Sequence, residues 1–98
     1  MHILELDETK TWLRIDGDDE DNTINMLIRA AEAYLKNATG KEFDKSNHQA
    51  KLFCLVLVAD WYENRELIGQ RVSDKVRFTI QSIMAQLQFS EIEEGEST

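Results

Sequence analysis

The residues whose side chains could support catalysis are few and widely separated in this sequence. The histidines are His2 and His48, and the single cysteine, Cys54, lies inside an apolar run. His48 and Cys54 are six positions apart, so on one helix they would face different sides and could not form a Cys–His pair. The sequence also has no glycine-rich phosphate loop and no Cys/His spacing typical of zinc sites. It therefore indicates neither an enzyme nor a protein that uses a cofactor.

The densest group of ionisable residues is the acidic turn, residues 16–21, which reads Asp-Gly-Asp-Asp-Glu-Asp. A calcium loop with this spacing needs glycine at its sixth position and glutamate at its twelfth. Counted from Asp16, those positions hold Asp21 and Leu27, so the pattern does not predict a metal site. The alternative is that these carboxylates precede a helix, where the helix dipole stabilises negative charge.

Composition and charge restrict the class of protein. The chain has 98 residues, of which 42% are hydrophobic, and this length and balance predict one globular domain. With 19 acidic and 11 basic residues, its net charge of −8 disfavours binding to nucleic acid or to an anionic membrane. The longest apolar run, 52–59, is too short to span a bilayer, and the N-terminus lacks the features of a signal peptide. We expect a soluble domain of the cytosolic type over residues 1–90 and a disordered acidic tail over residues 91–98.

The periodicity of apolar residues predicts an all-α fold, a small bundle of about four helices with a long central pair. The expected helices cover residues 6–14, capped by Asp7, and residues 19–38. The next covers residues 46–64, opened by a Ser46-x-x-Gln49 capping box, and the last begins after Ser73. Residues 66–72 are expected to form a loop or a short hairpin.

Two of these helices have informative patterns. The helix over residues 19–38 has one apolar stripe and a stop signal in which Gly40 can take the left-handed conformation. The stripe consists of Ile24, Leu27, Ile28, Ala31, Tyr34, Leu35 and Ala38. The next segment is apolar at every position from Leu52 to Ala59, so a buried strand is the competing interpretation. A helix of this kind must be covered on all sides, either by its own bundle or by another subunit.

The end of that helix carries a dense cluster, Asp60-Trp61-Tyr62-Glu63-Asn64-Arg65-Glu66. Aromatic residues and arginine are enriched at interface hot spots. An ordinary helix C-terminus is the other interpretation, with Arg65 placed favourably against the helix dipole. Composition does not decide between the two.

Taken in order, these segments resemble one known family. The elements of the resemblance are Leu6-Asp7-Glu8-x-Lys10-x-Trp12-Leu13-Arg14-Ile15-Asp16, the acidic residues 18–21, the stripe from Ile24 to Leu35, Thr39-Gly40-x-x-Phe43, and Trp61 to Glu66. Over about residues 4–88 the chain resembles the head–tail connector, or adaptor, proteins of long-tailed bacteriophages, also described as possible DNA-packaging proteins. Two features depart from the family pattern: Gln86-Leu87-Gln88 replaces Gln-Leu-Arg, and Val72-Ser73 stands where a proline often opens the last helix.

The resemblance implies a structural virion or prophage protein that forms a ring of about a dozen copies by head-to-tail contacts. Such a ring docks under the portal protein, extends the DNA channel without binding DNA specifically, and receives the next head-completion or tail protein. The particle would be assembled in the bacterial cytoplasm, with no membrane involved. Candidate interface or fold-signature residues are Arg14, Asp16, Asp18, Asp19, Tyr34, Gly40, Phe43, Trp61, Tyr62, Glu63, Asn64 and Arg65.

Two candidate contact elements and one alternative function are also expected. The loop 66–72 is a candidate channel-facing or partner-facing element, and the acidic turn is a candidate contact to a neighbour's lysine or arginine. The alternative function is a small acidic helical adaptor or inhibitor that binds a basic partner protein one-to-one. That protein would be a stable monomer or dimer with one exposed apolar patch.

Overall fold

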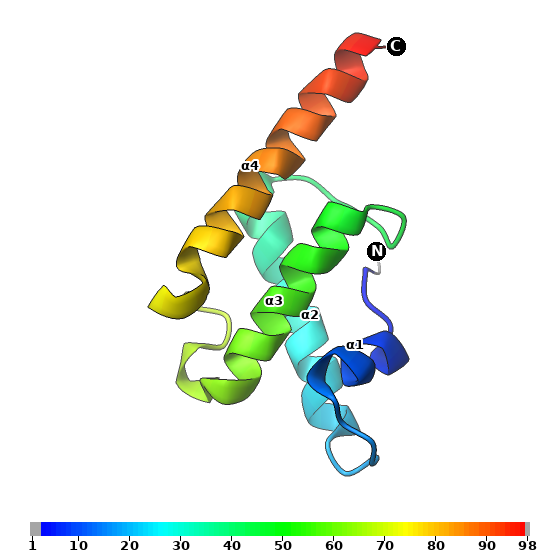
Figure 1. Ribbon diagram of the computed structural model, residues 1–98, viewed down its shortest axis with the longest axis vertical. Helices are drawn as coiled ribbons and strands as arrows, with labels where there is room; N and C mark the ends of the chain where they lie inside the picture. The colour runs from blue at the N-terminus through cyan, green and yellow to red at the C-terminus, as the bar shows by residue number, and fades with distance from the viewer. Residues whose placement is uncertain (1–2, 98) are drawn as a thin grey trace.

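In the described residues the fold consists of three α-helices packed around a fourth. The computed structural model describes residues 3–97, and side chains over residues 3–88. The helices are α1 (Leu6–Leu13), α2 (Asp21–Thr39), α3 (His48–Glu63) and α4 (Asp74–Ser97), with the short 3-10 helix η1 (Arg65–Leu67) after α3. Helix α3 packs against α1, α2 and α4 (Figure 1). The predicted all-α bundle with a long central pair, α2 and α3, is confirmed.

The link from α3 to α4 is a loop rather than a hairpin. Within the described residues no strand forms, and η1 followed by a turn occupies the start of the predicted 66–72 segment. Leu67 of η1 is buried, which attaches this link to the core. Gly69 has a φ of 74°, a conformation that glycine adopts without steric penalty.

The helix ends show where local sequence rules succeed and fail. Gly40 closes α2 with a φ of 73°, as predicted, and its N–H donates to the Lys36 carbonyl at 2.7 Å. Asp7 does not cap α1, because the helix already begins at Leu6. Glu5 occupies the N-cap position, and its N–H donates to the Glu8 carboxylate at 2.7 Å.

The predicted capping box at Ser46 and Gln49 is also wrong. Asn47 caps α3, with its side-chain oxygen accepting from the Ala50 N–H at 2.9 Å. The N–H and the hydroxyl of Ser46 both donate to the Asp44 carboxylate instead, at 2.9 and 2.5 Å. The serine therefore belongs to a turn that precedes the helix.

The core is built on one side of α3. On α2 the predicted stripe is buried except for Tyr34, which is half-buried, and Ala38, which is exposed. On α3 one side is fully buried, whereas Leu52 remains 38% exposed and Val56 is only partly covered. The chain therefore does not cover its apolar helix on all sides. The buried side consists of Ala50, Phe53, Cys54, Leu57, Val58 and Trp61.

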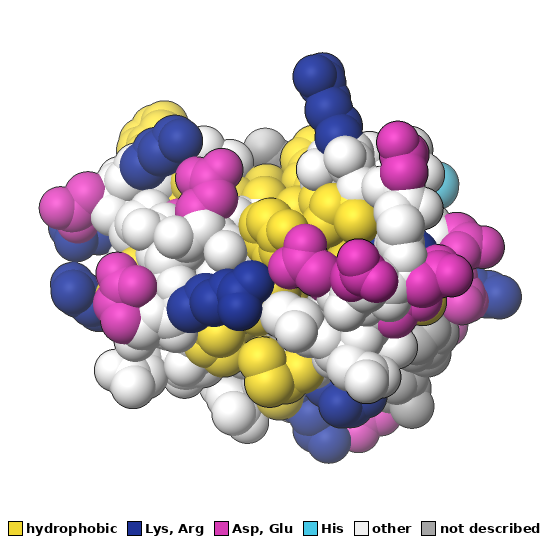
Figure 2. All heavy atoms as spheres, turned by 90° about the horizontal axis from the view of Figure 1, so that it is seen from below, with side chains coloured by type: hydrophobic (Ala, Val, Ile, Leu, Met, Phe, Trp, Pro, Cys, Tyr) yellow, Lys and Arg dark blue, Asp and Glu magenta, His cyan; other side chains and the backbone are white. Residues whose placement is uncertain are grey.

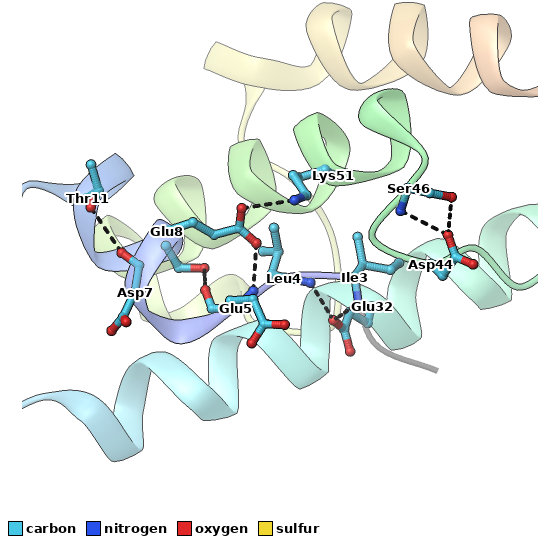
Figure 3. A network of polar contacts seen from close by, with 11 residues as sticks. Ile3, Leu4, Glu5, Asp7, Glu8, Thr11, Glu32, Asp44, Ser46 and Lys51 are labelled. Carbon is cyan, nitrogen blue, oxygen red and sulfur yellow. Dashed lines mark hydrogen bonds and ion pairs between the residues drawn. The ribbon is translucent and has the colours of Figure 1, made fainter.

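A buried carboxylate fixes the segment that precedes α1. Ile3 and Leu4 are fully buried, and their N–H groups donate to the Glu32 carboxylate at 2.8 and 3.1 Å (Figure 3). Lys51 on α3 pairs with Glu8 on α1 at 3.0 Å in the same region. These contacts hold α1 against the α2–α3 pair.

Within the residues whose side chains are described, helix α4 contacts the body as far as Leu87. Ile80, Ile83 and Leu87 are buried against the core, and the C-terminal end of the helix extends beyond the other helices (Figure 1). The helix continues to Ser97, through residues for which the sequence predicted a disordered tail. The side chains of residues 89–98 lie outside the described part, and the division into a domain and a tail stays a prediction.

Candidate assembly surfaces

Trp61 belongs to the core of the subunit. It is fully buried, and its indole N–H donates to the Arg71 carbonyl at 2.9 Å. Its ring meets Tyr34 of α2 edge to face, with centroids 5.6 Å apart, and Tyr34 also lies 6.4 Å from the Phe53 ring. Within the cluster at residues 60–66, Trp61 is therefore part of the core of the chain.

Asp60 was not among the predicted site residues, yet it organises the end of α3. Its side chain is almost fully buried and accepts from the N–H and hydroxyl of Ser73, at 2.9 and 2.5 Å. The Asn64 side chain donates to the Asp60 carbonyl and carboxylate at 2.9 and 3.2 Å. An acidic residue directly after an apolar run was the signal in the sequence, because a buried carboxylate requires donors.

Tyr62 and Arg65 connect α3 to the acidic turn. The Tyr62 hydroxyl donates to Glu20 at 2.5 Å, and Arg65 pairs with the same carboxylate at 3.3 Å. The Arg65 guanidinium lies 5.7 Å from the centroid of the Tyr62 ring. The hydrogen bond to Glu20 raises the pKa of Tyr62, as do burial and the negative charge of Glu20.

The acidic turn is held by a lysine of its own chain. Lys10 on α1 pairs with Asp21 at 2.8 Å and with Asp18 at 3.2 Å. The hydrogen bond to Asp21 is the main cause of a raised pKa for Lys10. Asp16 and Asp19 are exposed, which leaves them accessible to a neighbour. Among the described residues no cluster of His, Cys, Asp or Glu could hold a metal ion.

The remaining candidate residues have local roles or lie on the surface. Arg14 follows α1 in the left-handed conformation, with a φ of 62°, and Gly40 does the same after α2. Phe43 is half-buried and packs against the core. Glu63 is exposed at the end of α3 and lies 4.0 Å from Lys75 of α4. Some of the predicted interface or fold-signature residues therefore stabilise the fold, and the others lie on the surface.

An apolar groove between α1, α3 and α4 is the feature that sequence reasoning missed. It has a volume of about 310 Å³ and is lined by Trp12, Val56, Ala59, Asp60, Glu63, Lys75, Val76 and Thr79. Trp12 is 47% exposed at the edge of this groove. The floor of this groove is the part of α3 near Val56, which the other helices cover only partly. The all-apolar run was the signal in the sequence for this surface.

Further hydrophobic side chains reach the surface elsewhere. Phe78 on α4 is 80% exposed and Met26 on α2 is 44% exposed. Figure 2 shows hydrophobic side chains gathered in the middle of one end of the molecule, with charged side chains around them. Exposed aromatic side chains of this kind are typical of surfaces that become buried in assemblies.

The single cysteine does not form a reactive site. Cys54 is fully buried in α3, and burial, with a smaller contribution from the charge of Glu32, raises the pKa of its thiol strongly. It is therefore a thiol rather than a thiolate at neutral pH. None of the helices in the described part of the chain is long and apolar enough to cross a membrane.

These features define a small helical domain with exposed apolar and charged surfaces. The family model described as the phage gp6-like head-tail connector protein matches residues 3–91, and the chain belongs to this family. No curated protein and no solved structure gave a significant match. Membership identifies a phage structural protein of the connector between head and tail, which assembles with other phage head and tail proteins as a component of the virion.

Proposed function

We propose that this protein is a non-enzymatic subunit of a ring of about a dozen copies between the portal and the tail. The ring extends the DNA channel, completes the head and receives the next head-completion or tail protein. It is assembled in the cytoplasm of the host bacterium and becomes part of the virion. Family membership over residues 3–91 supports the connector role.

The observation that carries the ring is the apolar groove that the helices of the chain leave uncovered. The α1–α3–α4 groove exposes Trp12 and leaves Val56 and Ala59 only partly covered. A ring needs head-to-tail contacts, in which two different patches of each subunit meet. The groove supplies one apolar patch, and Phe78 on the outer side of α4 is an exposed aromatic that lies outside the groove lining.

The charge of the subunit suits passage of DNA rather than its capture. With 11 basic and 19 acidic residues, the chain has no excess of cations that could bind phosphate groups. The loop 66–72 and the exposed carboxylates Asp16 and Asp19 are the proposed channel-facing or neighbour-facing elements. If lysine and arginine, rather than aspartate and glutamate, line the bore of the assembled ring, this part of the proposal is wrong.

Native mass spectrometry over a concentration series, with negative-stain images of any large species, tests the ring. Rings of about a dozen subunits, alone or after addition of the portal protein of the same phage, support the proposal. The Trp12→Ala variant should lose assembly while it keeps its helical circular dichroism spectrum. A stable monomer or dimer that stays unassembled with the portal would favour the one-to-one adaptor.

A further inference from the structure

A second pocket, between α2 and α4, combines an apolar lining with two arginines. It has a volume of about 390 Å³ and lies on a different part of α4 from the first groove. Its lining consists of Tyr34, Arg71, Val72, Arg77, Ile80, Gln81 and Met84. Ile80 is buried, and Tyr34, Val72 and Met84 are half-buried, so an occupant would find a mostly apolar floor.

The two arginines are available to a ligand. Both are exposed, and within the described part of the chain the side chain of Arg71 makes no ion pair. Arg77 is paired with Asp74, an exposed residue one turn earlier on the same helix. Surface pairs of this type are weak, so a better acceptor can replace Asp74. Guanidinium groups beside an apolar floor fit carboxylates that flank an apolar side chain.

The same chain carries a segment of that chemistry. Residues 91–96 read Glu-Ile-Glu-Glu-Gly-Glu, four carboxylates around one isoleucine. A matching pocket and segment on one chain could meet either within a molecule or between molecules.

Helical geometry excludes the contact within one molecule. Arg77 and Glu91 lie on the single helix α4, which runs without a break from Asp74 to Ser97. At 1.5 Å per residue they are separated by about 21 Å along the helix axis. The C-terminal half of α4 also points away from the body (Figure 1).

We infer that the Arg71–Arg77 pocket binds the acidic C-terminal segment of a second copy of this protein. The contact is head-to-tail, because the pocket and the segment lie at opposite ends of α4. It rests on the proposed function in one respect, since repetition of such a contact is what closes a ring. It adds to that function the identity of the two contacting parts and their charge.

Titration of a fluorescein-labelled peptide of residues 89–98 tests the inference by anisotropy. The titrant is the full chain with Glu91, Glu93, Glu94 and Glu96 all changed to Gln, so that its own segment does not compete. We expect saturable binding at low salt that weakens as salt is raised. The pair Arg71→Glu and Arg77→Glu should weaken it by about tenfold or more, because two charge-assisted contacts are lost.

The control pair is Arg29→Glu with Lys45→Glu, which changes two exposed cations elsewhere and alters the net charge equally. It should leave binding nearly unchanged. A peptide with Ile92→Ser should also bind more weakly. Because this change leaves the protein itself unaltered, it tests the contact even if the arginine variant misfolds. No saturable binding, or equal losses in both pairs, would overturn the inference. Ring formation is measured in the separate experiment with the portal protein. The proposed contact and the proposed ring can therefore fail independently.

Discussion

The Asp60 carboxylate on α3 accepts two hydrogen bonds from Ser73, one from the backbone N–H at 2.9 Å and one from the hydroxyl at 2.5 Å. The indole N–H of the next residue, Trp61, donates to the carbonyl of Arg71 at 2.9 Å. Two consecutive side chains at the end of α3 thus fix the residues that lead into α4. The direction of α4, and with it the pocket that α4 forms with α2, depends on this connection.

Removal of the Asp60 carboxylate should therefore lower the free energy of unfolding substantially. In Asp60→Ala the donors of Ser73 and Asn64 lose their acceptor in a nearly buried position, and we expect a loss of about 2–3 kcal/mol. Urea unfolding followed by circular dichroism measures it. Glu63→Ala, three residues further on and exposed, is the matched control and should change stability by less than about 0.5 kcal/mol. Similar losses for both variants would contradict the assigned role of Asp60.

The two tryptophans should respond in opposite ways to truncation. Trp61 is fully buried, so Trp61→Ala should lower the free energy of unfolding by about 3–5 kcal/mol. Trp12 is 47% exposed, so Trp12→Ala should lower it by only about 1 kcal/mol. The assembly assay should show the reverse, with a loss for Trp12→Ala in a subunit that remains folded. A large loss of stability in Trp12→Ala would place that side chain in the core.

The sequence was sufficient for elements that depend on local periodicity. The stripe of α2 and the left-handed Gly40 follow from spacing and from the conformational freedom of glycine. It was insufficient where side chains compete for the same donor. Ser46 matched a capping pattern, but Asp44 takes its N–H and hydroxyl, and Asn47 caps α3 instead.

The site was harder to predict than the fold because it depends on which helices meet. Trp12 and Trp61 are equally apolar in the sequence, and only the packing of the helices buries the second and leaves the first exposed at the groove. The Asp60–Ser73 and Tyr62–Glu20 contacts join residues 13 and 42 positions apart. No periodic pattern reports contacts over such separations. The apolar run 52–59 nevertheless indicated correctly that α3 needs more cover than an ordinary surface helix.

Cys54 should report unfolding of the core. Its thiol is fully buried, and burial raises its pKa well above the ordinary value, so little thiolate is present or accessible in the folded protein. At pH 8 we expect a thiol reagent to label it slower by about two orders of magnitude or more than in denaturant. Labelling should accelerate in Trp61→Ala by about tenfold for each 1.4 kcal/mol of stability lost, because the population of the open state depends exponentially on the free energy of unfolding. Rapid labelling of the stable wild-type protein would contradict the buried position.

The Tyr62–Glu20 contact should be visible in an alkaline titration. The hydrogen bond to Glu20, burial and the charge of Glu20 all raise the pKa of Tyr62, so folding favours the neutral phenol. The resulting stabilisation is complete below the unfolded pKa, about 10, and is lost as pH rises through the higher folded pKa.

Tyrosinate absorbance of the wild type minus that of Tyr62→Phe isolates the titration of this residue. Its midpoint should lie above 10 (about the ordinary tyrosine pKa) and should fall in Glu20→Ala, which removes both the acceptor and the charge. Glu66→Ala, an exposed acidic residue of η1, should leave the midpoint unchanged. A midpoint that is insensitive to Glu20 would mean that the acidic turn does not contact the end of α3 in solution. In that case Asp16 and Asp19 would not be held in place by this contact for a neighbouring subunit.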